Sequence, residues 1–324
     1  MIGTRAVAVI PNEVRKLSGF ECQEKRDSSA KSMPRNDKYL NFPPVLLREG
    51  PEHRYMSSKN PFLEVAVEAA LEAGTILLAE FARPPDISYK GEVDIVTQAD
   101  RRSEQAIVNL LRARFPKHAI VAEEGGGSER DSPFRWHVDP LDGTTNFAHG
   151  YPCFAVSIGL EEAGELITGV IYQPVSGELF TAVKGEGAYL NQKKIHVSAI
   201  EKLATSLLCT GFPSVKRAQN PNIHYYWDFT LRSHGVRRDG SAAMDLASVA
   251  CGRFEGFWEF GLHSWDTAAG VLLVREAGGV VTRFDSHPYQ LGDRELLASN
   301  SRVHSEMIHI ATDIAERSAT RSLP

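Results

Sequence analysis

The sequence WHVDPLDGTTNF, residues 136–147, carries the densest chemical signal in the chain, because an apolar, strand-like run ends there in two aspartates. Asp139 and Asp142 at the end of one buried strand would repel each other, and this repulsion would raise their pKa values unless a cation lay between them. Carboxylates are hard oxygen ligands, which Mg²⁺ prefers. The stretch therefore predicts a magnesium site where a strand gives way to a helix.

The residues after the second aspartate predict an anion-binding turn. Gly143 and Thr144 begin a helix, so their backbone N–H groups have no partner within the helix and point outward at its positive end. Such N–H groups bind phosphate oxygens. A simpler interpretation is an ordinary turn in which Thr144 caps the helix, because Asp, Pro and Gly are common turn residues.

Three further acidic motifs favour the metal site over the simple turn. Glu123 follows a strand-like run at residues 119–122, and Asp266 opens a helix, where a capping role would explain it equally well. Asp100 follows Thr97 in the pattern of a capping box. Each motif is weak alone, but together they place five carboxylates at strand ends or helix starts, which predicts a site for two or three Mg²⁺ ions: Asp100, Glu123, Asp139, Asp142 and Asp266.

The hydrophobic pattern changes near residue 60. Residues 1–58 are rich in Lys, Arg, Asn, Pro and Ser and show no sustained apolar period, which is typical of a disordered extension. From Pro61 to Phe81, apolar residues recur at helical spacing. We interpret residues 1–58 as an extension with Met56 as a candidate start, and residues 59–324 as one catalytic domain.

The remaining pattern predicts helices and sheets in separate layers. Strands are expected at residues 87–89, 119–122, 136–138, 154–161, 166–173, 178–184, 188–190, 254–259 and 279–283, the central four forming a mostly antiparallel sheet. Helices are expected at residues 61–81, 98–115, 221–233, 241–250 and 266–277.

Composition excludes several classes of protein. With 42% hydrophobic and 24% charged residues the chain is globular, and its net charge of −5 disfavours binding to a nucleic-acid backbone. No membrane-spanning run or secretion signal is recognisable, so we expect a cytoplasmic protein without membrane contact. The four cysteines, which form no CxxC pair, are interpreted as reduced thiols: Cys22, Cys153, Cys209 and Cys251.

Three of these motifs together resemble the signatures of the inositol monophosphatase family: Glu123-Glu124, DPLDGTTNF at 139–147 and WDTAAG at 265–270. Their order and separation match over roughly residues 60–315. The resemblance implies the layered α-β-α-β-α sandwich of the inositol monophosphatase and fructose-1,6-bisphosphatase type. It also implies a homodimeric, lithium-sensitive, Mg²⁺-dependent phosphatase acting on a small phosphorylated polyol or sugar.

The resemblance implies roles for individual residues. One Mg²⁺ would be held by Glu123, Asp139 and the Leu141 carbonyl, the second by Asp139, Asp142 and Asp266, and a third through water by Asp100. Catalytic roles fall to Glu123, Thr144 and Asp100, the first two orienting the attacking water. Substrate contacts are implied for Glu123, Leu141, Asp142, Gly143, Thr144, Gly240, Ser241, Ala242, Glu259 and Asp266.

The chemistry agrees with these roles. One metal would lower the pKa of its bound water and the other would neutralise the leaving ester oxygen, so no catalytic Cys or Ser–His pair is needed. We interpret His137 and His263 as structural. Glu259 lies in an apolar strand end, where an idle carboxylate would carry a desolvation cost. It is interpreted either as a ligand for substrate hydroxyls or as a simple edge glutamate, and Ser241 also as a helix cap.

Two alternatives stay open. The substrate could be fructose bisphosphate, histidinol phosphate or adenosine bisphosphate, although Thr145-Asn146-Phe147 resembles the inositol type more than the nucleotide type. The chain could also be a regulatory protein that kept the fold and binds another protein or RNA.

Overall fold

The computed structural model describes residues 60–83, 87–89, 95–128, 130–212 and 220–320. The predicted extension at residues 1–58, including Met56, lies outside the described residues. Among the described helices, none is both long and apolar enough to cross a membrane.

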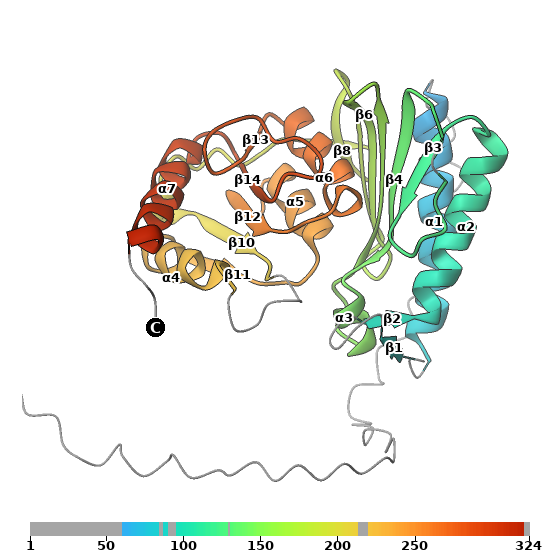
Figure 1. Cartoon of the computed structure of the whole chain (residues 1–324), viewed down its shortest axis with the longest axis horizontal. Helices are drawn as coiled ribbons and strands as arrows, with labels where there is room; N and C mark the ends of the chain where they lie inside the picture. Colours follow the sequence, from blue (N-terminus) through green and yellow to red (C-terminus); the bar gives the residue numbers. More distant parts are fainter. Residues whose placement is uncertain (1–59, 84–86, 90–94, 129, 213–219, 321–324) are drawn as a thin grey trace, which may run out of the picture. The chain divides into compact units, whose positions relative to one another are not determined.

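Helices and sheets alternate in five layers (Figure 1). The first layer is α1 (Pro61–Phe81) and α2 (Gln98–Arg114), which pack on one face of a seven-stranded sheet. That sheet has the strand order β3-β4-β5-β6-β7-β8-β9, with bounds Ala119–Ala122, Phe134–Asp142, Ala155–Glu162, Glu165–Gln173, Glu178–Val183, Gly187–Leu190 and Lys193–Ile195.

The opposite face of this sheet carries α5 (Ala242–Ala250) and α6 (Ser264–Glu276), which pack against each other. A five-stranded sheet follows, in the order β11-β10-β12-β14-β13, with bounds Gly235–Arg237, Leu207–Thr210, Gly256–Phe260, Glu295–Ser299 and Val280–Thr282. The last layer is α4 (Asn222–Arg232) and α7 (His304–Thr320). Shorter elements are β1 (Ile87–Tyr89), β2 (Ile95–Thr97), α3 (Thr144–Ala148) and the 3₁₀ turn Leu203–Thr205.

The predicted layered α-β-α-β-α sandwich is confirmed, with differences in detail. The large sheet is antiparallel except that β3 runs parallel to β4. Pattern reading missed β2, β9, β10, β11 and β14, because strands of three to five residues give too few positions to show an alternation. It missed the helix α7 as well. It also made β4 too short, since a local irregularity carries the strand past Pro140 as far as Asp142.

Alternation along two strands decides which side chains reach the middle layer. On β4, Trp136 and Val138 belong to the core under α1 and α2, so His137 and Asp139 face α6. On β12, Trp258 packs in the core that includes α4 and α7. Its neighbour Glu259 therefore faces the α5 and α6 side. The carboxylates of Asp139 and Glu259 thus point from the two different sheets towards the same layer, which α5 and α6 form.

The close approach of α6 to the large sheet depends on a pair of glycines. Gly159 on β5 and Gly169 on β6 lie directly opposite each other. A Cβ added to Gly159 would lie 2.5 Å from the Ala268 Cβ, and one on Gly169 would lie 2.9 Å from the Ala269 carbonyl oxygen. Any side chain here would push α6, and Asp266 with it, away from the sheet.

We predict that Gly159→Ala lowers the free energy of unfolding by about 1–3 kcal/mol, the usual cost of overpacking a close-packed contact. Gly235→Ala on β11 is the matched control, since a Cβ there meets its nearest atom, the Arg237 Nη1, at 3.4 Å. Urea unfolding of both variants measures the difference, and equal stability would show that α6 does not depend on this contact.

Candidate active site

The end of β4 is distorted so that its two aspartates lie close together. Asp139 pairs with Ser157 and Asp142 with Ala155, so two residues of β4 oppose one residue of β5. The Asp139 Oδ1 accepts a hydrogen bond from the Leu141 N–H at 2.9 Å. This bond turns the carboxylate along its own strand end.

The turn after β4 has the predicted strand-to-helix form. Gly143 has φ 97°, and a Cβ at this position would lie 2.9 Å from the Cys153 carbonyl oxygen, so only glycine fits. Gly143, rather than Thr144, is the N-cap of α3, and no side chain caps this helix. The Thr144 hydroxyl instead lies 3.1 Å from both the Leu141 carbonyl oxygen and the Asp100 Oδ1.

Asp100 is part of a capping box at the start of α2, as the sequence predicted. It is fully buried, and its Oδ2 accepts hydrogen bonds from the Thr97 N–H at 2.8 Å and the Thr97 hydroxyl at 2.6 Å. Its Oδ1 faces Thr144. Burial nevertheless raises the pKa of Asp100 above its usual value. The capping role and a role beside the β4 turn hold together.

Glu123 lies next to β4 because its N–H donates to the Val138 carbonyl oxygen at 3.2 Å. A buried glutamate on α2 fixes the turn that follows: the Glu104 carboxylate accepts the N–H groups of Glu124 and Gly126, each at 2.7 Å. Sequence analysis missed Glu104, although a glutamate at a core-facing position of an amphipathic helix was a usable signal.

Asp266 occupies the third position of α6, where its Oδ2 accepts the His263 N–H at 2.7 Å. The expected alternative of a simple N-cap is wrong, because the N-cap is His263 and Asp266 supplies the capping-box carboxylate. The His263 ring stacks on Trp265, with ring centroids 4.6 Å apart. The first turn of α6 is thus ordered by its own residues.

These carboxylates repel one another strongly. Burial raises the pKa of Asp139 well above its usual value, and the charges of Glu123, Asp142 and Asp266 raise it further. Burial, followed by the Asp142 charge, raises the pKa of Asp266 to about 8. The pKa of Asp142 is raised by burial to about 6 although Ser241 and Ala243 donate hydrogen bonds to it. A cation between them would remove this repulsion.

The donor set fits Mg²⁺, which takes carboxylate and carbonyl oxygens. No three His, Cys, Asp or Glu side chains in the described part of the chain are already closed around one point. The Asp142 Oδ2 accepts hydrogen bonds from the Ser241 hydroxyl at 2.6 Å and from the Ala243 N–H at 2.7 Å.

The same two hydrogen bonds hold the predicted substrate contacts close to the β4 aspartates, although about a hundred positions of sequence separate the two segments. These predicted contacts are Gly240, Ser241 and Ala242. Ser241 also caps α5, since its Oγ accepts the Met244 N–H at 3.3 Å. The Asn146 side chain adds a link that the sequence did not reveal, because its Nδ2 donates to the Asp239 carbonyl oxygen at 2.8 Å. The α3 turn and the start of α5 are therefore held together.

Glu259 borders the candidate site on the side away from the β4 aspartates. Its side chain is 8% exposed, and burial, followed by the charges of Asp266 and Asp142, raises its pKa to about 8. A Cβ on Gly211 would overlap the Glu259 carboxylate, so the absence of a side chain at Gly211 leaves the space that this carboxylate occupies. The interpretation as an edge glutamate is wrong, because β12 is the central strand of its sheet.

Asp245, which sequence analysis did not select, lies beside Glu259. It is 1% exposed on α5, and burial, followed by the Glu259 charge, raises its pKa well above the usual value. It lies four residues after the N-cap Ser241 and is the only charged residue of α5. That single charge in a helix of mostly apolar residues was the available signal.

Comparison with known proteins gives one consistent result. Residues 58–316 match the family model described as "Inositol monophosphatase family". An inositol-1-monophosphatase of Synechocystis is 46% identical over 255 residues, covering 78% of this chain and 88% of that protein. The Nus factor SuhB of Escherichia coli is 42% identical over 254 residues, covering 77% and 95%.

Solved structures agree with the sequence matches. The structure of an inositol monophosphatase from Anabaena (Nostoc) superposes with a TM-score of 0.71 and is 44% identical, covering 78% of this chain and 95% of that one. The SuhB protein of Bartonella henselae gives a TM-score of 0.75 at 40% identity, with 78% and 98% covered.

We predict that the melting temperature of the metal-free protein falls as the pH rises from about 5 to about 9. The folded-state pKa of Asp266 is about 8, whereas an unfolded aspartate has a pKa of about 3.9. The folded state therefore binds the proton more tightly, and its stabilising effect is complete below the unfolded pKa and is lost as the pH passes the folded value. Thermal unfolding in chelator, across this pH range, measures the fall.

Asp266→Asn should reduce this fall, because the amide cannot ionise. Asp313→Asn, at an exposed aspartate paired with Arg317, is the control and should leave it unchanged. A melting temperature independent of pH in the metal-free protein would contradict the proposed repulsion.

Proposed function

Because this chain belongs to the inositol monophosphatase family, whose members are metal-dependent phosphatases, we propose that it hydrolyses inositol monophosphate with two or three Mg²⁺ ions. The observation that carries the proposal is the set of four mutually repelling carboxylates, Glu123, Asp139, Asp142 and Asp266. They lie at three places in the fold: the end of β3, the end of β4 and the start of α6. A fold that gathers such charges at a cost in stability needs a cation there.

The ions would be held by these four side chains and by the Leu141 carbonyl, with Asp100 acting on a third ion through water. When bound, Mg²⁺ lowers the pKa of a coordinated water and offsets the charge of the leaving ester oxygen. The Thr144 hydroxyl has one proton and two acceptors at 3.1 Å, the Leu141 carbonyl oxygen and the Asp100 carboxylate. With Glu123 it would orient the attacking water.

Phosphate would be bound by the backbone N–H groups of Gly143 and Thr144. These groups are directed by the left-handed conformation of Gly143, which no other residue adopts without overlap. The substrate ring would then extend towards the start of α5 and Glu259, where Gly240, Ser241 and Ala242 lie. A carboxylate accepts hydrogen bonds from hydroxyl groups, so Glu259 favours a polyol over a nucleoside at this position.

A regulatory role is a second candidate, because some relatives carry the name Nus factor SuhB. That name describes those proteins. In this chain the full carboxylate set is present, and we therefore propose catalysis as the primary activity. A direct comparison of kcat/KM distinguishes the inositol proposal from phosphatase activity on fructose bisphosphate, histidinol phosphate or adenosine bisphosphate.

We also propose that the protein is a homodimer. Ile223, Trp227 and Leu231 recur every four residues on α4 and are 54%, 67% and 68% exposed, whereas Tyr225 and Phe229 of the same helix are buried. An apolar stripe of this size on one helix face is typical of a protein interface, and a stripe that packs on its own copy forms a two-fold contact.

Phosphate release from inositol 1-phosphate should require Mg²⁺ and stop in excess EDTA. Asp139→Asn should lower kcat by on the order of a hundredfold, because it removes one charge from the stabilisation of the reacting phosphoryl group. The family resemblance also predicts inhibition by Li⁺. Undiminished hydrolysis in chelator would refute the metal mechanism, and a near-normal rate for Asp139→Asn would remove that residue from it.

Glu259→Ala should lower kcat/KM for inositol 1-phosphate by roughly tenfold to a hundredfold, the effect of losing a charged hydrogen bond. Hydrolysis of a small aryl phosphate, which lacks the ring hydroxyls, should change little. Glu255→Ala is the matched control: Glu255 is buried, lies directly before β12 and accepts the Leu207 N–H at 2.6 Å, away from the site. Equal losses on both substrates would assign Glu259 to the scaffold.

Trp227→Lys should convert the dimer into a monomer, because a charge would have to be buried at the centre of the stripe. Sedimentation velocity measures the change. Ile200→Lys, at an exposed apolar residue away from α4, should leave the dimer intact. A wild-type protein that sediments as a monomer at micromolar concentration would refute the homodimer.

A further inference from the structure

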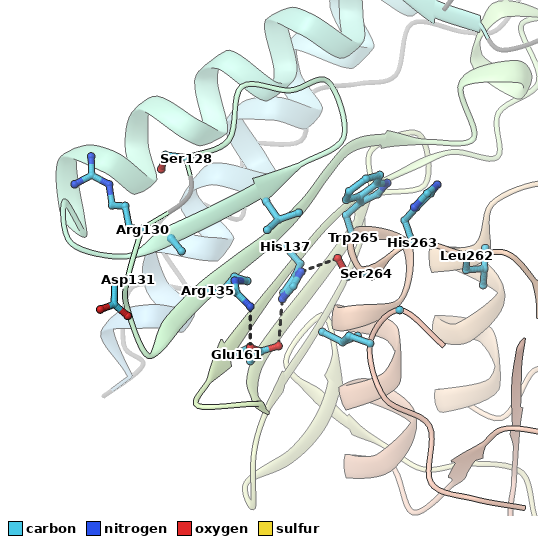
Figure 2. Close-up of a pocket in the computed structure, with 14 residues that line it drawn as sticks. Ser128, Arg130, Asp131, Arg135, His137, Glu161, Leu262, His263, Ser264 and Trp265 are labelled. Atoms are coloured by element: carbon cyan, nitrogen blue, oxygen red, sulfur yellow. Dashed lines mark hydrogen bonds and ion pairs between the residues drawn. The ribbon is translucent and has the colours of Figure 1, made fainter. Parts of the chain in front are cut away.

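A pocket of about 840 Å³ lies beside the candidate metal site, on the α6-facing side of β3 and β4 (Figure 2). None of the four proposed metal carboxylates lines it. Its floor contains three polar side chains that come from three different elements: His137 of β4, Glu161 of β5 and Ser264 of α6. The mechanism proposed above does not use any of them.

These three side chains form a continuous chain of contacts. The His137 Nδ1 lies 2.9 Å from the Ser264 Oγ, and its Nε2 lies 3.4 Å from the Glu161 Oε2. Glu161 in turn lies 3.7 Å from the Arg135 Nη1 (Figure 2). A carboxylate opposite Nε2 favours the tautomer with its proton on that nitrogen. Nδ1 then accepts the hydrogen bond, and the Ser264 hydroxyl donates it.

This hydrogen bond joins two of the elements that supply the proposed metal ligands, β4 and α6. His137 lies two residues before Asp139 on the same face of β4, and Ser264 lies two residues before Asp266 in the first turn of α6. The residues are 127 positions apart in the chain, and His137 is 3% exposed. A single shift of α6 along the sheet would therefore have two effects: it would break this hydrogen bond, and it would move Asp266 away from Asp139.

The apolar contact between α6 and the sheet cannot fix this register by itself. Gly159, Gly169, Ala268 and Ala269 present small surfaces, and apolar packing is non-directional, so it sets how closely the helix approaches rather than its position along the strands. Hydrogen bonds are directional. A second one, from the Ser157 hydroxyl to the Trp265 carbonyl oxygen at 3.2 Å, ties the same helical turn to β5.

We propose that His137 and Ser264 are positioning residues that set the spacing between the β4 aspartates and Asp266, and hence the affinity for Mg²⁺. The inference rests on the proposed metal-dependent function. Losing a group that orients metal ligands typically costs tenfold to a hundredfold in metal affinity. Neither residue is among the proposed metal ligands or substrate contacts.

The test is Mg²⁺ binding to the full-length protein in the absence of substrate, measured by calorimetry and by the rise in melting temperature with added Mg²⁺. His137→Ala and Ser264→Ala should each weaken Mg²⁺ binding by roughly tenfold to a hundredfold. The double variant should be no weaker than the single ones, because both remove one interaction. Ser264→Thr, which keeps the hydroxyl, should bind Mg²⁺ nearly as tightly as the wild type.

Imidazole added to His137→Ala should restore part of the Mg²⁺ affinity, since the pocket beside His137 gives a small molecule access to the vacated position. His304→Ala is the matched control. The His304 Nδ1 lies 2.8 Å from the Ser299 Oγ, a similar buried contact at the opposite end of β14 from the strand end that pairs with Glu259. Its loss should lower the melting temperature and leave Mg²⁺ affinity unchanged.

Unchanged Mg²⁺ affinity in both single variants would overturn the positioning role, as would additive losses in the double variant. A wild-type protein that binds Mg²⁺ but releases no phosphate would refute the proposed function alone, because the binding comparison is made without substrate. A wild-type protein that binds no Mg²⁺ would overturn both.

Discussion

The mutual repulsion of four carboxylates is the constraint on which the rest of this structure depends. Burial and the charges of neighbouring carboxylates, Glu123 among them, raise the pKa values of Asp139, Asp142 and Asp266. No apolar core would gather such charges, so the surrounding scaffold must hold them in place against their own repulsion. In the metal-dependent function proposed above, a divalent cation would relieve this repulsion.

The scaffold meets this constraint with backbone N–H groups and with small residues. The start of α5 donates to Asp142, the start of α6 donates to Asp266, and the Leu141 N–H donates to Asp139. Helix N-termini favour negative charge, so two of the repelling groups, Asp142 and Asp266, are partly stabilised before any metal binds. Gly159 and Gly169 then allow α6 to approach the sheet closely enough for Asp266 to join the others.

Two further groups of residues surround the carboxylates and serve different purposes. On one side lie the buried carboxyl groups of Glu259 and Asp245. On the other side, Glu161, His137 and Ser264 form a chain of contacts between β5, β4 and α6. In the function proposed above, Glu259 would recognise the substrate, and His137 and Ser264 would set the relative position of the elements that carry the charge.

The sequence by itself determined the local features of the site. The capping box of Thr97 and Asp100 and the strand-to-helix turn at Gly143 depend on neighbouring residues, and their patterns predicted them correctly, whereas the left-handed conformation of Gly143 was not predicted. The layered fold was also predicted, although on family resemblance as much as on periodicity. Short strands such as β11 were missed, because three residues carry no measurable alternation.

Only the tertiary structure decided how these local features meet. The Ser241–Asp142 hydrogen bond joins residues 99 positions apart, and the His137–Ser264 contact joins residues 127 positions apart. Neither has a sequence pattern, because such a contact depends on how closely helices and sheets pack, and many residues spread along the chain determine that packing. Local conformational preference placed each carboxylate at the end of its element, and close packing between layers brought those ends together.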